Sequence, residues 1–262
     1  MISPPKPHPF PRPRRFVFPK PQRLPRSKRL TIAAAFPCKD GAVICADTQE
    51  IIPGYVKTDT EKMTVIAGTH FNIAFTGAGD SDLIEMTVQE MDIELTKTKA
   101  TAEWDIRKAI KSALLDVFNN HILPDPDILP EDRPELLIAL QYDAGVLLYK
   151  TRGTRFLRLH SPACVGRGVV LAKSLSAQLF KKNMPLRLGC IVALYVLNQT
   201  KRWVDGCGGN SDVLLLSDRD RSIVRISTEK VQTFEKHFDE FNEYIRPLLL
   251  ATADRETTDA TF

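Results

Sequence analysis

The residues best suited to chemistry in this sequence are a threonine, an aspartate and a lysine that lie near one another along the chain. Thr31 opens a run of small and apolar residues that ends at Asp47, and Lys62 follows. A threonine hydroxyl is almost fully protonated at neutral pH, so it becomes a good nucleophile only when a base removes its proton. If the chain is cut before Thr31, the new α-amino group has a usual pKa of about 7.7–8.0 and can act as that base. A lysine would lower the amine's proton affinity by like-charge repulsion, and an aspartate would orient the lysine.

Two predicted strand pairs carry these residues. Residues 30–38 and 42–47 are small or apolar and flank a Lys-Asp-Gly sequence at 39–41, which is typical of a hairpin turn. Residues 62–66 and 72–76 are a second pair of strand candidates. We therefore expect Asp47 and Lys62 near strand ends, where side chains from different strands can meet.

A helix is expected after the second strand pair, because Asp80 and Ser81 can cap it and apolar residues follow at helical spacing. The whole order is strands, two helices, strands, two helices, a hairpin and a long C-terminal amphipathic helix. This order predicts an α+β fold, with two antiparallel sheets flanked by helix pairs in a four-layer αββα sandwich. A doubly wound parallel fold would need strict alternation of strands and helices.

The chain divides by composition. Residues 1–30 carry nine Lys or Arg, nine of the 18 prolines and no acidic residue, which leaves 27 basic and 32 acidic side chains for the rest. Such a segment cannot bury enough apolar surface to fold alone, so we expect a disordered basic, proline-rich tail or propeptide at 1–30. The folded domain is expected at 31–250 and a C-terminal tail at 251–262.

Composition also excludes several classes of protein. With 43% hydrophobic and 26% charged residues the chain is typical of a soluble globular protein, and no apolar run reaches the roughly 20 residues of a membrane helix. Five cysteines without a CxxC pair indicate reduced core thiols and a cytoplasmic protein. The five histidines are scattered and there is no P-loop or dinucleotide motif, so we expect neither a metal nor a cofactor.

A family resemblance rests on the first sixty positions after the tail. Residues 31–49, followed by Tyr55, "TEKM" at 60–63 and "FTGAGDSD" at 75–82, resemble a proteasome β-type subunit of the N-terminal nucleophile hydrolase superfamily. In that family the mature chain begins with threonine, a "DG" turn closes the first hairpin and an "AD" pair ends the second strand. The resemblance implies that Thr31 is the nucleophile.

The same resemblance assigns the other site residues. Lys62 matches the catalytic lysine if the preceding loop is one residue shorter than usual, and Asp47 matches the aspartate that orients it. Gly79 matches the glycine whose N–H stabilises an oxyanion, and Asp205 matches a supporting aspartate. Gly77 and Glu85 are expected in the substrate pocket, where the charge of Glu85 favours long basic side chains.

The implied protein is a threonine-type endopeptidase whose subunits form rings around a chamber. Its expected partners are polypeptide substrates, copies of itself or related ring subunits, and a regulatory unfoldase. It would use no cofactor, and neither a membrane nor nucleic acid is expected as a partner. Its activity requires removal of residues 1–30.

Three departures from the family pattern support an alternative, a non-catalytic structural ring subunit. Leu30 stands where active members usually have glycine, Arg167 replaces the serine of a "GSG" segment, and Gly208 replaces a second supporting serine. The tail has three interpretations: a propeptide, a solvated arm, or a segment that binds polyanions. The last would suit a third class, a nucleic-acid-associated protein, although no folded recognition motif accompanies the tail.

Overall fold

The computed structural model describes residues 28–29, 31–52 and 56–259, with side chains for 31–50 and 57–245. One of its two antiparallel sheets has five strands, because the small and β-branched residues of the first hairpin pair with strands from the C-terminal half. Its order is β11 (Ala163–Gly166), β2 (Ile32–Cys38), β3 (Gly41–Asp47), β12 (Ser211–Ser217) and β13 (Ile223–Arg225). Strand β3 is buried along its whole length, so this sheet is covered on both faces.

The second sheet is built around the longest strand, β7 (Phe71–Asp80). Its order is β10 (Arg155–Leu159), β9 (Gly145–Arg152), β8 (Glu135–Tyr142), β7, β1 (Lys28–Arg29), β4 (Gln49–Ile52) and β5 (Val56–Asp59), and β6 (Thr64–Ala67) also pairs with β7. Strands β6 and β1 share one edge of β7, with β6 opposite Asn72–Phe75 and β1 opposite Gly79 and Asp80.

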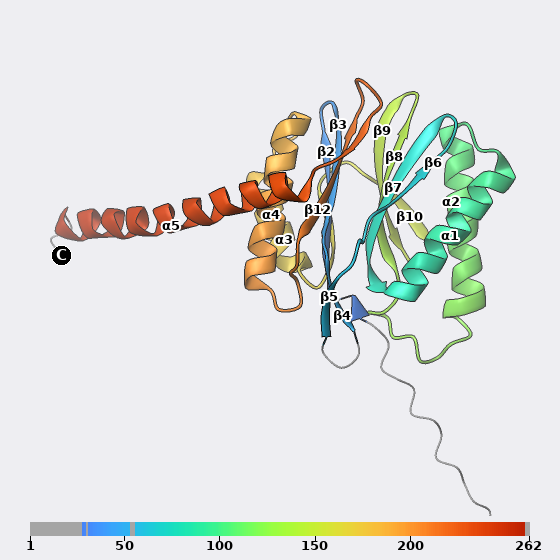
Figure 1. Cartoon of the computed structure of the whole chain (residues 1–262), viewed down its shortest axis with the longest axis horizontal. Helices are drawn as coiled ribbons and strands as arrows, with labels where there is room; N and C mark the ends of the chain where they lie inside the picture. Colours follow the sequence, from blue (N-terminus) through green and yellow to red (C-terminus); the bar gives the residue numbers. More distant parts are fainter. Residues whose placement is uncertain (1–27, 30, 53–55, 260–262) are drawn as a thin grey trace, which may run out of the picture.

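The helices lie on the outer faces of the sheets (Figure 1). The larger sheet carries α1 (Ser81–Thr98), α2 (Glu103–Val117) and a short π-helix at Phe118–Ile122, and the five-stranded sheet carries α3 (Val169–Leu179) and α4 (Leu186–Trp203). As expected, Asp80 caps α1, accepting hydrogen bonds from the backbone N–H groups of Asp82 and Leu83. Helix α5 (Thr228–Asp259) starts against α4 and then extends away from the body of the protein.

Three apolar layers hold these elements together. Small side chains such as Ala33, Ala35 and Ala46 of one sheet meet Ala74 and Ala139 of the other, so the sheets face each other closely. A second cluster joins the five-stranded sheet to α3 and α4, and a third joins the larger sheet to α1 and α2. The α+β fold with antiparallel sheets that the sequence predicts is therefore confirmed.

The structure differs from the sequence-based boundaries at three places. Lys28 and Arg29, assigned to the tail, form β1 because β7 and β4 offer backbone hydrogen-bonding partners on both sides. The strands β4 and β5 were not expected from the sequence. Helix α5 runs to Asp259, beyond the expected domain end at 250. Residues 1–27, Leu30 and Tyr55 lie outside the described residues.

None of the helices that the structure describes is long and apolar enough to cross a membrane.

The orientation of α1 gives a stability prediction. Met91 is fully buried against the larger sheet, whereas Ile93 on the same helix is 44% exposed. We expect Met91→Ala to lower the free energy of unfolding by about 2–5 kcal/mol because it leaves a cavity. Ile93→Ala should change that free energy by no more than about 0.5 kcal/mol. Denaturant titrations of the two variants check this, and equal losses would contradict the described packing.

Candidate functional site

Thr31 lies immediately before β2, and backbone contacts on two sides fix its position. The hairpin register pairs Ala33 with Ala46, and this brings the backbone N–H of Ile32 to 3.2 Å from a carboxylate oxygen of Asp47. On the other side, the backbone N–H of Arg167 donates to the carbonyl oxygen of Thr31 at 2.8 Å. Gly166 permits this approach, because a Cβ there would lie 2.1 Å from that carbonyl oxygen.

The side chains of Thr31, Asp47 and Lys62 form one cluster between the sheets. The Thr31 hydroxyl donates to Asp47 Oδ1, and Lys62 Nζ donates to Thr31 Oγ1 at 2.8 Å and to Asp47 Oδ1 at 2.9 Å. A further acceptor for Lys62 is the carbonyl oxygen of Gln49. Thr31 and Asp47 are 0% exposed and Lys62 is 4% exposed. The structure thus brings together the three residues that the sequence singled out.

This cluster is electrostatically satisfied although it is buried. An unpaired buried charge would cost several kcal/mol, so the ammonium of Lys62 and the carboxylate of Asp47 depend on each other. The second carboxylate oxygen of Asp47 accepts the backbone N–H of Gly208 at 2.9 Å. A hydroxyl between a carboxylate and an ammonium has a proton acceptor on one side and a cation on the other, and groups of these kinds can activate a nucleophile.

Gly79 is the second-last residue of β7, and Asp80 separates it from α1. Its φ of +128° is a conformation that other residues rarely adopt, and a Cβ there would lie 2.8 Å from the carbonyl oxygen of Arg133. In the sheet register Gly79 is opposite Arg29 of β1. The chain preceding Thr31 therefore lies as an antiparallel strand beside the glycine to which an oxyanion role is assigned.

A pocket of about 350 Å³ opens next to Lys62, between the segment that carries it and α1. Glu85 lines this pocket, and so does Thr76, whose buried Oγ1 has no hydrogen-bond partner among the described residues. Gly77 does not line it. A Cβ at Gly77 would instead lie 2.6 Å from the Leu136 side chain on β8, so the missing side chain serves strand packing.

Asp205 and Arg167 are not part of the cluster. Both side chains are exposed, and no ion pair joins them among the residues that the structure describes. Arg167 approaches Thr31 through its backbone, and Asp205 makes no side-chain hydrogen bond within the described ranges. The loop that contains Asp205 reaches the site through Gly208 instead.

Sequence reasoning missed Gln49. Its carbonyl oxygen accepts from Lys62, and its side chain lies so close to Gly208 that a Cβ there would be 2.5 Å from Gln49 Oε1. The family pattern has serine at position 208, where this chain has glycine. The side chain of Gln49 fills the space that a serine side chain would need. The glycine at 208 was visible in the sequence, but nothing local linked it to Gln49.

Cys207 is a second neighbour of the site that sequence reasoning did not include. Burial, and then the negative charge of Asp47, raise the pKa of its thiol to about 12, so the thiol stays neutral at physiological pH. No group of His, Cys, Asp and Glu side chains that could hold a metal ion occurs in the described part of the chain.

Comparisons with known proteins identify the fold. No protein-family model matches the sequence, and no curated protein matches it either. Among solved structures, Anbu (ancestral beta-subunit) from Yersinia bercovieri superposes with a TM-score of 0.70 at 14% identity, covering 83% of this chain and 97% of its own. Anbu from Hyphomicrobium sp. strain MC1 gives 0.68 at 15% identity, covering 84% and 97%. A helical assembly of the Anbu complex from Pseudomonas aeruginosa gives 0.69 at 13%, covering 84% and 96%.

These neighbours correct the family expected from the sequence. They are Anbu proteins, which form a proteasome-like family distinct from proteasome β subunits proper, so the expectation of a proteasome β-type subunit was wrong. The motifs at 31–49 and 75–82 belong to a hairpin and a strand-to-helix junction of the shared fold, and such features do not distinguish families within it. At these identities the likeness establishes the fold alone.

The buried ion pair gives a second prediction. Lys62→Met removes the cation beside Asp47 and should lower the free energy of unfolding by about 3–5 kcal/mol, because an unpaired carboxylate stays buried. The matched control is Lys97→Met, whose exposed pair with Glu94 at 2.8 Å should leave the melting temperature unchanged. Thermal unfolding at pH 7 measures both. A Lys62→Met protein as stable as the wild type would show that the pair is not formed.

The cysteines give a prediction that depends on pH. Burial raises the pKa of Cys164 and of Cys190 from 9.0 to about 11, so each folded thiol holds about one-hundredth of the thiolate of an unfolded one at pH 8. Iodoacetamide should therefore label native protein about 100-fold more slowly than protein unfolded in guanidinium chloride. The native rate should rise about tenfold per pH unit up to pH 10, as measured by mass spectrometry. Equal native and unfolded rates would contradict the burial of these thiols.

Proposed function

We propose that this chain is a self-assembling threonine-type endopeptidase subunit on a four-layer αββα scaffold. Hydrolysis of the Leu30–Thr31 bond would make Thr31 the N-terminal residue of the mature subunit. Thr31 would then be the nucleophile of the enzyme. The observation that carries this proposal is the fully buried contact of the Thr31 hydroxyl with both Asp47 and Lys62. A strand-forming threonine has no structural need for a lysine and an aspartate that are themselves buried, because burying these charges is costly.

The proposed reaction uses Thr31 as nucleophile and as base. Its hydroxyl oxygen bonds to the carbonyl carbon of the substrate while the hydroxyl proton moves to its own α-amine. The backbone N–H of Gly79 stabilises the developing oxyanion. As the C–N bond breaks, the amine returns the proton to the leaving nitrogen, and the acyl group remains as an ester on Thr31. Water then hydrolyses this ester.

Lys62 and Asp47 prepare the amine for this role. The ammonium of Lys62 is 2.8 Å from Thr31 Oγ1, so its positive charge would disfavour protonation of the new α-amine nearby. Asp47 holds Lys62 in place at 2.9 Å and is itself fixed by the N–H of Gly208. Asp205, assigned a supporting role from the sequence, lies on the exposed loop and has no part in this proposal.

The chain that includes residues 1–30 would be an inactive precursor. Thr31 is fully buried, and β1 lies between β7 and β4, with Arg29 opposite Gly79 near the end of β7. Release of this strand would free backbone groups of β7 and β4, and an extended peptide could pair with them by strand addition. The substrate would then pass Thr31 in the direction that β1 now takes.

The pocket next to Lys62 is the proposed specificity pocket. Glu85 on α1 contributes a negative charge, and the unpartnered hydroxyl of Thr76 offers a polar contact inside. Glu61, which also lines the pocket, is neutralised by an ion pair with Arg225. These groups favour a substrate with a long basic side chain before the scissile bond.

Self-assembly is the second part of the proposal. Two of the structural neighbours are described as an ancestral β-subunit and as a helical assembly of a complex, so we infer that copies of this chain also associate. A non-catalytic structural subunit of such a particle is the alternative function. It is favoured by the complete burial of Thr31 and by the absence of a hydroxyl side chain at Gly208.

Intact mass and peptide hydrolysis together test the proposal. Wild-type protein should lose residues 1–30 and cleave peptides, faster with lysine than with leucine before the scissile bond. Thr31→Ala should keep its full length and lower turnover by about 10³-fold or more, because no other group replaces the nucleophile. The control Thr233→Ala, on the surface of α5, should behave as wild type.

Three outcomes would contradict all or part of this proposal. A full-length wild-type chain that does not react with threonine-directed electrophilic inhibitors would support the structural subunit instead. Processed wild-type protein with equal turnover of the lysine and leucine peptides would refute only the proposed pocket. Turnover by Thr31→Ala at the wild-type rate would refute the catalytic role.

A further inference from the structure

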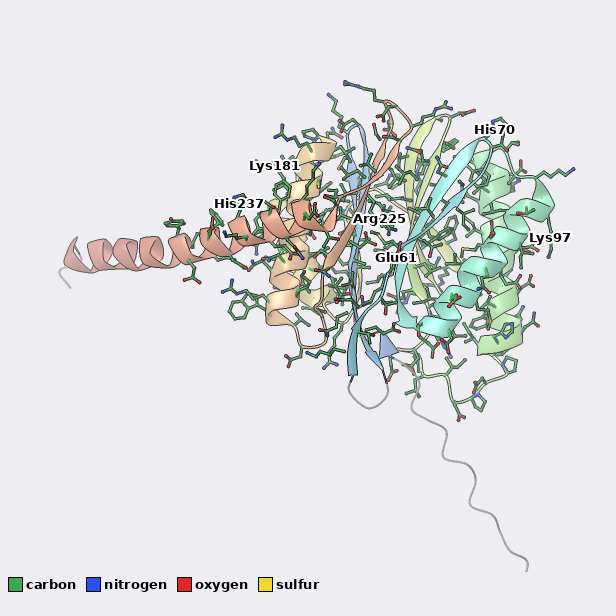
Figure 2. All side chains as sticks on the ribbon, in the orientation of Figure 1. Glu61, His70, Lys97, Lys181, Arg225 and His237 are labelled. Atoms are coloured by element: carbon green, nitrogen blue, oxygen red, sulfur yellow. The ribbon has the colours of Figure 1, made fainter. Side chains whose placement is uncertain are left out.

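Arg225 contacts the residues on both sides of Lys62. It lies at the end of β13, in the sheet that carries Thr31 and Asp47, and its guanidinium forms an ion pair with the carboxylate of Glu61. A second guanidinium nitrogen, Nη2, donates to the carbonyl oxygen of Met63 at 3.2 Å. Figure 2 shows Glu61 and Arg225 side by side in the central part of the protein.

The same guanidinium is tied to the strand next to Asp47. Its Nε lies 3.6 Å from Asp212 Oδ1 on β12, and Asp212 pairs in register with Ala46, the residue before Asp47. Burial raises the pKa of Asp212, and the positive charge of Arg225 lowers it, so the two groups interact in a partly buried place. Arg225 therefore joins the sheet of Asp47 to the segment of Lys62.

The segment of Lys62 needs such a support. Residues 60–63 have no regular secondary structure and connect β5, which ends at Asp59, to β6, which begins at Thr64. Lys62 thus reaches Thr31 and Asp47 from a stretch of chain that belongs to neither a strand nor a helix, and at its start the backbone N–H of Thr60 donates to the carbonyl oxygen of Thr48 at 2.8 Å. The planar guanidinium can bind a carboxylate and a carbonyl at the same time, which a lysine ammonium does with less directional control.

We propose that Arg225 is a positioning residue that holds the backbone around Lys62, and thereby keeps the Lys62 ammonium in contact with Thr31 and Asp47. It touches neither Thr31 nor Asp47 within the described residues, so it acts through Glu61 and Met63. The catalytic consequence rests on the proposed function, whereas the effect on Lys62 does not.

The first experiment measures peptide hydrolysis by the processed protein. Arg225→Lys and Arg225→Gln should lower kcat by about tenfold or more with little change in KM, because a displaced lysine affects the reacting group and not substrate binding. The control is Arg202→Gln. The side chain of Arg202 on α4 is 37% exposed, close to the 40% of Arg225. Arg202 also contacts two acidic residues, but these are Asp239 and Glu243 on α5, away from Lys62. This control should keep the wild-type kcat.

The second experiment does not depend on activity. The full chain is acetylated with acetic anhydride, and the rate at Lys62 is read by mass spectrometry relative to Lys201, whose side chain is 10% exposed and pairs with Glu235. Lys62 should react at least tenfold faster in Arg225→Gln than in the wild type, with Lys201 unchanged, and Arg225→Lys should give an intermediate rate. Arg202→Gln should leave the Lys62 rate unchanged.

The outcomes separate the two proposals. Faster acetylation of Lys62 alone, together with a wild-type protein that neither loses residues 1–30 nor hydrolyses peptides, would support the positioning role and refute the proposed function. An unchanged Lys62 rate in both Arg225 variants would overturn the positioning role, whatever the activity. Equal acceleration at Lys62 and Lys201 would also overturn it, because the change would then be a general loosening of the fold.

Discussion

The buried ion pair between Asp47 and Lys62 is the constraint on which the rest of the site depends. Two charges without access to water are tolerated only when each neutralises the other and their remaining hydrogen-bonding groups are occupied. Here the Thr31 hydroxyl, the carbonyl of Gln49 and the N–H of Gly208 provide those partners. Any backbone movement that separates the pair would expose an unpaired charge to an apolar interior, so the surrounding elements must hold it closely.

Three parts of the chain meet at this pair. The first hairpin brings Asp47 and Thr31, the segment after β5 brings Lys62, and the loop after α4 brings Gly208. Close packing of alanines between the two sheets allows the approach, because larger side chains would hold the sheets apart. The close contact between the Gln49 side chain and Gly208 is a second example of tight packing around the ion pair. A side chain missing at one position is matched by a longer one at its neighbour.

The state of the chain before Thr31 connects the structure to its proposed regulation. Strand β1 lies between β4 and β7 with Arg29 opposite Gly79, and Thr31, two residues further along the chain, is 0% exposed. In the proposed function, the backbone groups of β4 and β7 that now pair with β1 bind an extended peptide after β1 is released. The Anbu structures share this fold at 14% identity, so the same arrangement of strands and helices is compatible with very different sequences.

The sequence by itself determined the local elements and one relation within the site. The short turn at 39–41 between two runs of small and apolar residues sets the register of the first hairpin, and this register places Thr31 beside Asp47. The capping of α1 by Asp80 was equally local. The sequence also singled out Lys62, but only the tertiary structure decided that its ammonium contacts both Thr31 and Asp47. The tertiary structure also decided that Asp205 stays outside the cluster. Gly208 lies 161 residues from Asp47 in the sequence and Arg225 lies 164 residues from Glu61, so their supporting contacts depend on the fold as well. The physical reason is that strand and helix periodicity depends on near neighbours, whereas charge burial depends on which distant segments the folded sheets bring together.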